Sequence, residues 1–352
     1  GYNSQDLQQV TNPDGSTWTY AKTGQIAVNP PIYTLPHEDE INDCPDEVEP
    51  EFGQFSITVK APSGASGKFD FEVMRHYRQL TNPICMKESS TYEYLLVPRY
   101  SASLTLTKKT LSGPALETLA WDYAYDYDQN DRKIVTINRT GVEFQRLVFG
   151  TTFDVDEGQL LELSKGANAN TILRTESTQY TSKALDPSLP FPACAGLPPY
   201  TYASKLASAC FAPLKSRSIT QDGVVYNTTI SAFDALARAK RTVKSSTLGA
   251  SRTDEVDYSD NLTHYVLGQV ARSYNIDTGG VVEAETQYTG LAQPWKIYKF
   301  GKLQQTLGYN TDGTIASVAD GNGNAILLSN WKRGIPQSIF QPVTPEAPQG
   351  AS

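Results

Sequence analysis

The segment 307–328 reads LGYNTDGTIASVADGNGNAILL, and this stretch decides the fold class. Apolar and polar residues alternate on both sides of two turn clusters, Asn310-Thr311-Asp312-Gly313 and 320–324. Asp-Gly and Asn-Gly pairs tolerate the positive φ of tight turns, and strict alternation is typical of half-buried strands. The segment therefore predicts three strands joined by two turns.

The same pattern occurs near the other end of the sequence. Asn12-Pro13-Asp14-Gly15 separates a short apolar stretch from the alternating residues 16–20, which predicts another hairpin. The composition agrees, with 20 Tyr, 25 Gly and 21 Pro but 2 Met. Tyr favours strands, whereas Gly and Pro favour turns. We therefore expect an all-β chain of repeated hairpins with few short helices. The run 231–243 suits a helix by its Ala content or a hairpin by the repeat, and we favour the hairpin.

Four aromatic residues alternate strictly in the stretch Trp121, Tyr123, Tyr125 and Tyr127. A period of two places them on one face of a strand. On the return strand, the residues expected opposite them are Ile134, Thr136 and Asn138. We interpret the stripe as sheet packing, with a carbohydrate-binding platform as the alternative. The candidate binding aromatics are Trp121, Tyr123, Tyr125, Trp295 and Trp331.

The length of 352 residues favours two lobes or one elongated repetitive body. A Pro-rich stretch, 186–213, is the best candidate for a boundary, with one short helix expected at 202–210. We thus expect a strand-rich N-terminal lobe at 1–185, a connector at 186–213, a hairpin array at 214–340 and a tail at 341–352. The acidic, Pro-rich segment 30–51 is expected to be an exposed loop tied down by Cys44.

Charge and hydropathy exclude several classes of protein. The formal net charge of −8 argues against a nucleic-acid partner. No run of about 18 apolar residues occurs, so we expect no membrane span. The first 20 residues lack a basic start and an apolar stretch, so no signal peptide is expected there and the sequence reads as a piece of a longer chain.

The four cysteines, Cys44, Cys85, Cys194 and Cys210, are too widely spaced for a zinc site. Proximity in the sequence favours two disulfides, Cys44–Cys85 and Cys194–Cys210. Four cysteines allow three pairings, and free buried thiols are the alternative. Disulfides would indicate an oxidising compartment.

No arrangement of residues indicates catalysis, so we expect neither an enzyme nor a cofactor. Asp126, Asp128 and Asn130 begin like a calcium loop, but Asp131 and Ile137 replace the Gly and Glu that such a loop needs. The acidic turn around Asp154, Asp156 and Glu157 is interpreted as a solvated loop, with a catalytic or calcium-binding turn as the alternative. His76 and His264 are interpreted as ordinary sheet or surface residues, with a general base as the alternative. The basic run Arg238, Lys240, Arg241 and Lys244 is interpreted as a solvated strand face.

The hairpins share one unit: a strand with an aromatic residue, a turn with Asp or Asn and Gly, and a return strand. It recurs at 2–20, 226–242, 288–303 and 309–318. Within it, the segment 233–238, FDALAR, resembles the Tyr-Asp-x-x-Gly-Arg core of the YD repeat, with Phe for Tyr and Ala for Gly. The segment 309–313 resembles the Tyr-x-x-Asp-Gly half of that repeat. On these residues, and on 10–20, 267–270 and 315–324, the chain resembles the RHS/YD-repeat superfamily of large bacterial wall-associated proteins.

The resemblance implies a β-sheet that spirals into a curved shell, which in this family encloses a toxin domain or forms part of an adhesive surface protein. It implies a secreted or cell-surface location. The expected partners are the remainder of the full-length chain, a toxin cargo, or a cell-surface glycan or protein. An adhesin-like module that contacts glycans through its aromatic strand faces is the alternative function. Residues 340–352 lack the Asp-Pro-x-Gly-type processing motif of the family, so self-cleavage is not expected.

Overall fold

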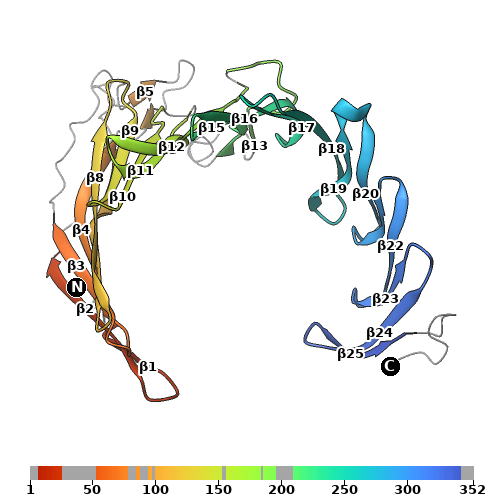
Figure 1. Ribbon diagram of the computed structural model, residues 1–352, viewed down its shortest axis with the longest axis horizontal. Coiled ribbons are helices and arrows are strands. Elements are labelled where there is room, and N and C mark those ends of the chain that lie inside the picture. The colour runs from red at the N-terminus through yellow and green to blue at the C-terminus, as the bar shows by residue number, and fades with distance from the viewer. Residues whose placement is uncertain are drawn as a thin grey trace. The chain divides into compact units, whose positions relative to one another are not determined.

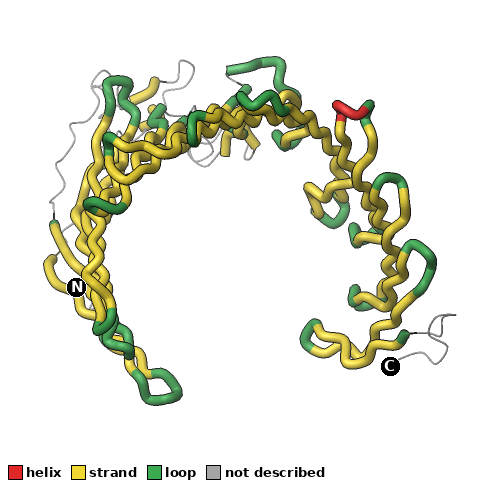
Figure 2. The backbone as a smooth tube through the Cα atoms, in the orientation of Figure 1, coloured by secondary structure: helices red, strands yellow, loops and turns green. Residues whose placement is uncertain are grey.

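The computed structural model of this chain describes residues 7–25, 53–77, 85–87, 94–96, 100–152, 156–183, 185–195 and 209–341. Almost all regular structure in these residues is β-strand, so the all-β prediction is confirmed (Figures 1 and 2). The chain divides into two compact units. Unit 1 comprises Gly1–Pro187 and Pro192–Val225, and unit 2 comprises Ser188–Phe191 and Tyr226–Ser352.

Unit 1 holds the first fifteen strands. They are β1 (Gln9–Thr11), β2 (Thr17–Gln25), β3 (Gln54–Lys60), β4 (Ser66–Tyr77), β5 (Cys85–Lys87), β6 (Tyr94–Leu96), β7 (Tyr100–Gly113), β8 (Leu116–Tyr127), β9 (Lys133–Arg139), β10 (Glu143–Phe149), β11 (Leu160–Asn168), β12 (Thr171–Tyr180), β13 (Cys194–Ala195), β14 (Ala209–Cys210) and β15 (Leu214–Gln221).

The ladder of unit 1 is antiparallel throughout and follows chain order, with two departures. The strands pair in the order β1, β2, β3, β4, β7, β8, β9, β10, β11, β12, β15. The departures are the short ribbons β5–β6 and β13–β14, which pair only within themselves. Most of the remaining pairs are hairpins of consecutive strands, as the turn signals of the sequence predict, whereas long segments separate the partners in β2–β3, β4–β7 and β12–β15.

Unit 2 holds the remaining strands and one helical turn, drawn red in Figure 2. They are β16 (Val224–Phe233), β17 (Ala239–Ser246), β18 (Ser251–Asn261), β19 (Val266–Asn275), η1 (Ile276–Thr278), β20 (Val281–Tyr288), β21 (Pro294–Lys299), β22 (Lys302–Tyr309), β23 (Ile315–Asp320), β24 (Ala325–Lys332) and β25 (Ile335–Phe340). Every strand pairs antiparallel with the next in chain order. The run 231–243 thus forms part of the β16–β17 hairpin, which confirms the prediction of a hairpin in place of a helix there.

Few side chains are fully buried, so the ladders and their cross-strand contacts carry much of the stability. In unit 1 the buried apolar residues are Phe55, Val73 and Val148, and the ring of Phe55 stacks on Phe71 at 5.1 Å between centroids. In unit 2, Phe191 and Phe233 meet edge to face at 5.7 Å. Phe191 is 1% exposed, although it lies in the Pro-rich stretch of the sequence.

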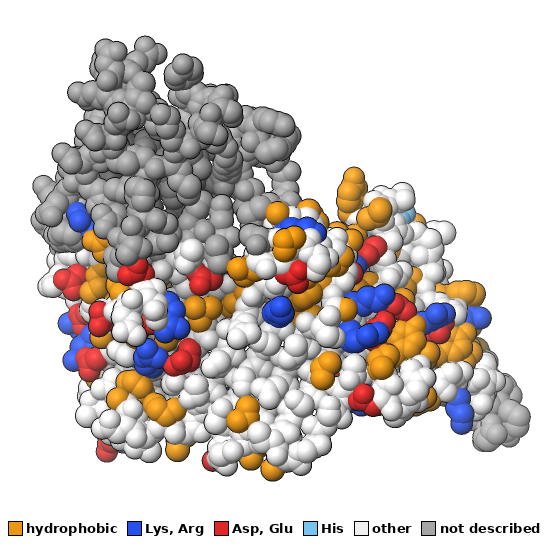
Figure 3. Space-filling model, turned by 90° about the horizontal axis from the view of Figure 1, so that it is seen from above, with side chains coloured by type: hydrophobic (Ala, Val, Ile, Leu, Met, Phe, Trp, Pro, Cys, Tyr) orange, Lys and Arg blue, Asp and Glu red, His pale blue; other side chains and the backbone are white. Residues whose placement is uncertain are grey.

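Cross-strand ion pairs line unit 2. Arg241–Glu255 and Lys244–Asp254 join β17 to β18, Arg272–Glu285 joins β19 to β20, and Arg252–Glu283 joins β18 to β20. Figure 3 shows cationic and anionic side chains interspersed on the surface that it views. Opposite charges on nearby strands attract each other, so these pairs support a sheet that has a small apolar core.

The register opposite the aromatic stripe differs from the prediction by one residue. Tyr123 faces Ile137, Tyr125 faces Val135 and Tyr127 faces Lys133, whereas the predicted partners Ile134, Thr136 and Asn138 face Asp126, Ala124 and Asp122. The prediction was wrong because the turn is one residue longer than 128–131. Asp128 pairs with Arg132 across it, and this extra residue shifts the return strand.

Several predictions fall on segments that the structure describes in part or not at all. The loop 30–51, Cys44 and the tail beyond residue 341 lie outside the described residues. So does most of the helix expected at 202–210, of which Ala209 and Cys210 belong to β14. Among the described residues, no helix has the length and apolarity to cross a membrane.

Candidate functional site

One five-residue turn is used eight times among the described residues. Its first residue donates its N–H to the carbonyl of the fifth and accepts the N–H of the fourth. The fourth residue has positive φ in each case. This is a type I turn followed by a residue in the left-handed region, a common three-residue hairpin loop. The turns are 12–16, 61–65, 128–132, 234–238, 246–250, 289–293, 310–314 and 320–324.

Side chains close two of these turns in the same way. In the turn 234–238, Asp234 Oδ1 accepts the N–H groups of Leu236 and Arg238, and Asp234 Oδ2 accepts Arg238 Nε at 2.7 Å. In the turn 128–132, Asp128 makes the corresponding contacts, with Arg132 Nε at 2.7 Å. An aromatic residue precedes both aspartates in the sequence, Phe233 and Tyr127. The two turns therefore form one recurrent motif, aromatic-Asp-x-x-x-Arg.

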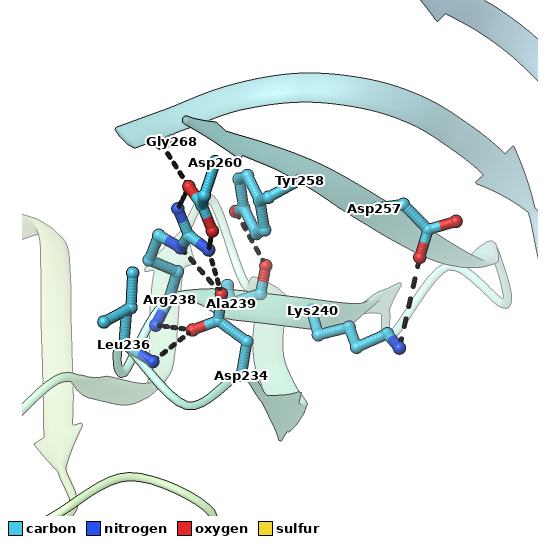
Figure 4. Close-up of polar contacts among 9 residues, drawn as sticks. All are labelled: Asp234, Leu236, Arg238, Ala239, Lys240, Asp257, Tyr258, Asp260 and Gly268. Atoms are coloured by element: carbon cyan, nitrogen blue, oxygen red, sulfur yellow. Dashed lines mark hydrogen bonds and ion pairs between the residues drawn. The ribbon is translucent and has the colours of Figure 1, made fainter. Parts of the chain in front are cut away.

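Arg238 also reaches the next turn on the same edge of the sheet (Figure 4). Its guanidinium donates to both oxygens of Asp260, each at 2.7 Å, and its Cζ lies 4.1 Å from the centroid of the Tyr258 ring. Asp260 Oδ1 also accepts the N–H of Gly268 at 2.9 Å. One arginine thus joins the β16–β17 turn to the β18–β19 hairpin. The sequence-based interpretation of Arg238 as a solvated side chain was wrong, since its side chain is 21% exposed.

The electrostatics of this cluster favour its ionised form. The hydrogen bond to Asp260 raises the pKa of Arg238 above its ordinary value. Hydrogen bonds from Arg238 and then from Gly268 lower the pKa of Asp260 to about 2. Burial opposes ionisation of Asp234, but the hydrogen bonds from Arg238 outweigh it and lower the pKa of that carboxyl. Both carboxylates therefore stay charged across the physiological range.

Further side-chain bonds continue this connection from turn to turn. Asn261 Nδ2 donates to the Gly290 carbonyl at 2.9 Å, and Gln269 Nε2 donates to the Ala292 carbonyl at 2.8 Å. Gln293, which occupies the same turn position as Arg238, donates to the Gly313 carbonyl at 3.4 Å. We call this series of contacts, from Asp234 to Gly313, the turn ladder. It ties successive hairpins of unit 2 together along one edge.

Aromatic side chains add a second kind of tie between neighbouring strands. The hydroxyls of three tyrosines donate to backbone carbonyls of the preceding strand: Tyr258 to Ala239, Tyr288 to Val270 and Tyr309 to Pro294. Trp331 Nε1 donates to the Ile315 carbonyl at 3.0 Å in the same manner. Each of these aromatics adds a side-chain hydrogen bond to the backbone ladder between its own strand and the preceding one.

The aromatic face of β8 is partly covered. β7 pairs with β8 only as far as Lys108 and Asp122, beyond which β8 pairs with β9 alone. Yet the Tyr125 hydroxyl donates to the carbonyl of Leu106 in β7 at 2.9 Å, and the Tyr127 hydroxyl accepts the N–H of Tyr77 in β4 at 2.8 Å. The β4–β7 ribbon therefore folds over this face of β8. Burial raises the pKa of both Tyr125 and Tyr127.

The candidate binding aromatics have different surroundings, and the structure does not bring all five together. Trp121 is half-buried, with Lys109 Nζ at 4.7 Å and Arg139 Cζ at 5.4 Å from its ring centroid. Tyr123 and Tyr125 continue the same face of β8. In unit 2, Trp331 is half-buried and hydrogen-bonded, whereas Trp295 is 42% exposed with Lys296 over its ring. A glycan-binding role for these residues stays a prediction.

The acidic turns and cysteines have the following places. Asp128 closes its turn with Arg132, and Asp156 accepts the N–H of Thr152. No group of three metal-binding side chains lies together in the described part of the chain. In β13–β14 the register sets Cys194 opposite Cys210. Cys85 lies in β5. Both disulfides stay predictions.

An open groove of about 710 Å³ lies beside the turn ladder, between β18, β19 and β20. Its carboxylates already have partners: Asp257 accepts the Tyr274 hydroxyl, Asp260 binds Arg238, and Glu285 binds Arg272. The contacts of Asp257 and Glu285 join β19 to the strands on either side of it, next to the groove.

No protein-family model matches this chain, and no curated protein matches it. Among solved structures, it is similar to a chain of the Photorhabdus luminescens Tc holotoxin pore. The TM-score is 0.43 and the identity 11%, over 97% of this chain and 16% of that one. This chain thus spans less than a fifth of the length of that neighbour.

Sequence reasoning missed one copy of the motif. Tyr127-Asp128-Gln129-Asn130-Asp131-Arg132 was taken for part of a degenerate calcium loop, yet it repeats the spacing of Phe233, Asp234 and Arg238. The signal was the Asp-to-Arg spacing of four residues after an aromatic. It was hidden because Asp131 replaces the expected Gly at the positive-φ position, where its φ is 60°.

Proposed function

We propose that this chain is a non-catalytic structural segment of an RHS/YD-repeat protein, secreted or displayed at a cell surface, and that it contributes to a β-shell enclosing a toxin cargo. The observation that carries the proposal is the aromatic-Asp-x-x-x-Arg turn, present twice with the same internal hydrogen bonds. Its spacing is that of the Tyr-Asp-x-x-Gly-Arg core of the repeat, with Phe for Tyr in one copy and Ala or Asp for Gly.

The physical properties of unit 2 support a wall rather than a catalytic scaffold. An isolated hairpin is marginally stable because it cannot bury its apolar face, but stacked hairpins stabilise one another through their neighbours. The turn ladder supplies such neighbour contacts outside the backbone ladder, from Asp234 through Asp260 to Gly313. The ionic cluster of Asp234, Arg238 and Asp260 thus joins neighbouring hairpins.

Protease protection of the full-length protein tests this function. If the chain forms part of a closed wall, a polypeptide segment inside that wall is protected from protease in the native protein. The segment becomes cleavable when the wall is opened. The double variant Arg238→Ala with Asp260→Ala removes the side-chain contact between the turns of two hairpins, so we expect it to release the cargo to protease. Leu248→Ala, at an exposed turn position, is the matched control that leaves protection intact.

Complete digestion of every other domain of the native, folded protein would contradict enclosure.

The adhesin-like alternative is favoured by one observation, the 42% exposure of Trp295. This alternative predicts binding to a glycan array that Trp295→Ala abolishes and Trp331→Phe leaves unchanged. Trp331 is the control because its Nε1 donates a hydrogen bond to the Ile315 carbonyl of β23.

A further inference from the structure

The end of the β4–β7 ribbon that folds over the aromatic face of β8 has a polar connection to β9. We call this end, residues 71–77 of β4 with 103–106 of β7, the flap. His76 in the flap lies with its ring centroid 5.8 Å from that of Tyr125, at an interplanar angle of 60°. Its Nδ1 lies 2.9 Å from Lys133 Nζ of β9, and its Nε2 lies 2.6 Å from Thr105 Oγ1 of β7.

Only one arrangement of protons satisfies all three of these groups. Lysine is a donor without acceptor capacity, so His76 Nδ1 must accept its hydrogen bond and carry no proton. The proton then resides on Nε2, which donates to Thr105 Oγ1. The Thr105 hydroxyl in turn donates to the Ser103 carbonyl at 3.2 Å. The chain of hydrogen bonds therefore runs from the Lys133 ammonium through His76 and Thr105 to the Ser103 carbonyl. It requires a neutral imidazole at His76.

Protonation of His76 would break this chain at its first bond. An imidazolium carries a proton on both nitrogens, so Nδ1 would turn an N–H group toward the Lys133 ammonium. The hydrogen bond would be replaced by two positive charges about 3 Å apart, whose repulsion is strong in a partly buried site. Lys133 lies on β9 and His76 on β4, so the repulsion would act between these two strands and drive the end of β4 away from β8 and β9.

We propose that His76 and Lys133 form an acid-sensitive latch that holds the flap against the aromatic face of β8 at neutral pH and releases it on acidification. Release would expose Tyr125 and Tyr127, whose hydroxyls bond to the flap backbone at Leu106 and Tyr77. The latch thus couples one titrating side chain to the exposure of an aromatic surface in unit 1.

The groups that face His76 agree with this direction. They are Lys133 from β9, Tyr125 from β8 and the uncharged Thr105 from β7. Burial and then the charge of Lys133 lower the pKa of His76 below its ordinary value of 6.5. Burial also lowers the pKa of Lys133. Since the folded flap resists protonation of His76, its contribution to stability is complete above pH 6.5 and is lost as the pH falls through the folded-state pKa.

Hydrogen exchange of the flap amides in the intact chain tests the latch. After correction for the intrinsic pH dependence of exchange, we expect protection of residues 73–77 and 104–106 to fall about tenfold or more between pH 7.5 and pH 5.0. His76→Gln keeps an acceptor for Lys133 and a donor for Thr105 but cannot titrate, so its flap protection should not change with pH. His264→Gln, at an exposed turn of unit 2, is the matched control and should behave like the unaltered chain.

A second variant keeps the proposal testable if His76→Gln folds poorly. Lys133→Met removes the facing charge, so the NMR titration of the His76 ring should move upward toward 6.5 and the loss of flap protection should move with it. Either of two results would overturn the latch: flap protection that is equal at pH 7.5 and 5.0 in the unaltered chain, or the same pH dependence in His76→Gln.

Discussion

Two alanines occupy a backbone conformation that ordinarily favours glycine. Ala237 and Ala292 are the fourth residues of their turns, with φ of 61° and 62°. The left-handed region costs an L-residue roughly 1–2 kcal/mol because Cβ approaches the neighbouring carbonyl oxygen. At residue 237 the repeat that this turn resembles has glycine, so the chain stores strain at a point of contact between hairpins.

Ala237→Gly should therefore stabilise the chain. We expect a gain of about 0.5–1 kcal/mol in the free energy of unfolding, since relief of the left-handed strain exceeds the added backbone entropy of glycine in the unfolded state. Denaturant unfolding of the two proteins measures it. Ala235→Gly, two residues earlier at negative φ, is the control and should destabilise. A loss of stability in Ala237→Gly would show that its buried methyl group matters more than its φ.

The Arg238 guanidinium binds two carboxylates, those of Asp234 and Asp260. Replacing it with methionine leaves Asp234 and Asp260 without their donor, and hydrogen bonds to charged groups are worth roughly 1.5–3 kcal/mol. Since all three side chains are partly exposed, we expect the lower part of that range, about 2 kcal/mol. Arg238→Lys keeps the charge but loses the paired hydrogen bonds and should recover less than half of the loss.

The loss caused by Arg238→Met should depend on pH with a defined sign. The pKa of Asp260 is about 2 in the folded chain against an ordinary 3.8, so its contribution is present above pH 3.8 and is lost as the pH falls through 2. The stability difference between Arg238→Met and the unaltered chain should therefore be constant from pH 7 to 5 and shrink below pH 4. Urea unfolding at each pH measures it, and a difference that grew below pH 4 would contradict the assignment.

Among the elements, the β13–β14 ribbon is the place where the sequence-based disulfide prediction can be examined directly. Cys194 and Cys210 are opposite each other in an antiparallel pair. Directly opposite residues have Cα atoms about 4.5–5.5 Å apart, which is within the range that a disulfide spans. Closing the loop between them is worth roughly 3 kcal/mol in the chain-entropy model.

We expect peptide mapping of the non-reduced protein to recover a cross-link between Cys194 and Cys210. Reduction should then lower the midpoint of thermal unfolding, and Cys194→Ser with Cys210→Ser should reproduce that decrease. Recovery of either cysteine as a free thiol from protein prepared under oxidising conditions would rule the bond out.

The strands themselves were predictable because their patterns are local. Alternation and Asp-Gly pairs defined the hairpins around 12–16 and 310–314, and both form as expected. The register opposite Trp121 to Tyr127 was not predictable, because it depends on whether a turn holds four or five residues. The partners of Arg238 were hidden for a different reason: Asp260 lies 22 residues away, and only the pairing of β17 with β18 brings it close.

At the scale of the whole molecule, the contacts are almost entirely between neighbours in the sequence of strands. Stability of such an array is approximately a sum of unit stabilities and neighbour interfaces. Unfolding should therefore be graded along the chain, because no single core unites the strands of a unit.

Native-state hydrogen exchange should reveal this gradation. Arg238→Met should reduce protection in β16 to β19 about tenfold or more while leaving β1 to β4 and β23 to β25 within twofold of the unaltered chain. Asp320→Ala, which opens the β23–β24 turn, is the complementary variant and should affect the other end of unit 2. Equal loss of protection everywhere in either variant would indicate all-or-none unfolding instead.

The turn ladder has a consequence for how such a chain can change in length. Its contacts join every second turn, since alternate turns of an antiparallel array lie on opposite edges of the sheet. Insertion or deletion of two strands preserves the edge on which each aspartate and arginine meet. A change of one strand reverses the direction of every later strand and moves Arg238-type residues to the opposite edge, away from the acceptors that they meet in the turn ladder. Repeat number in this architecture is therefore subject to a parity rule, and viable length variants should differ by whole pairs of strands.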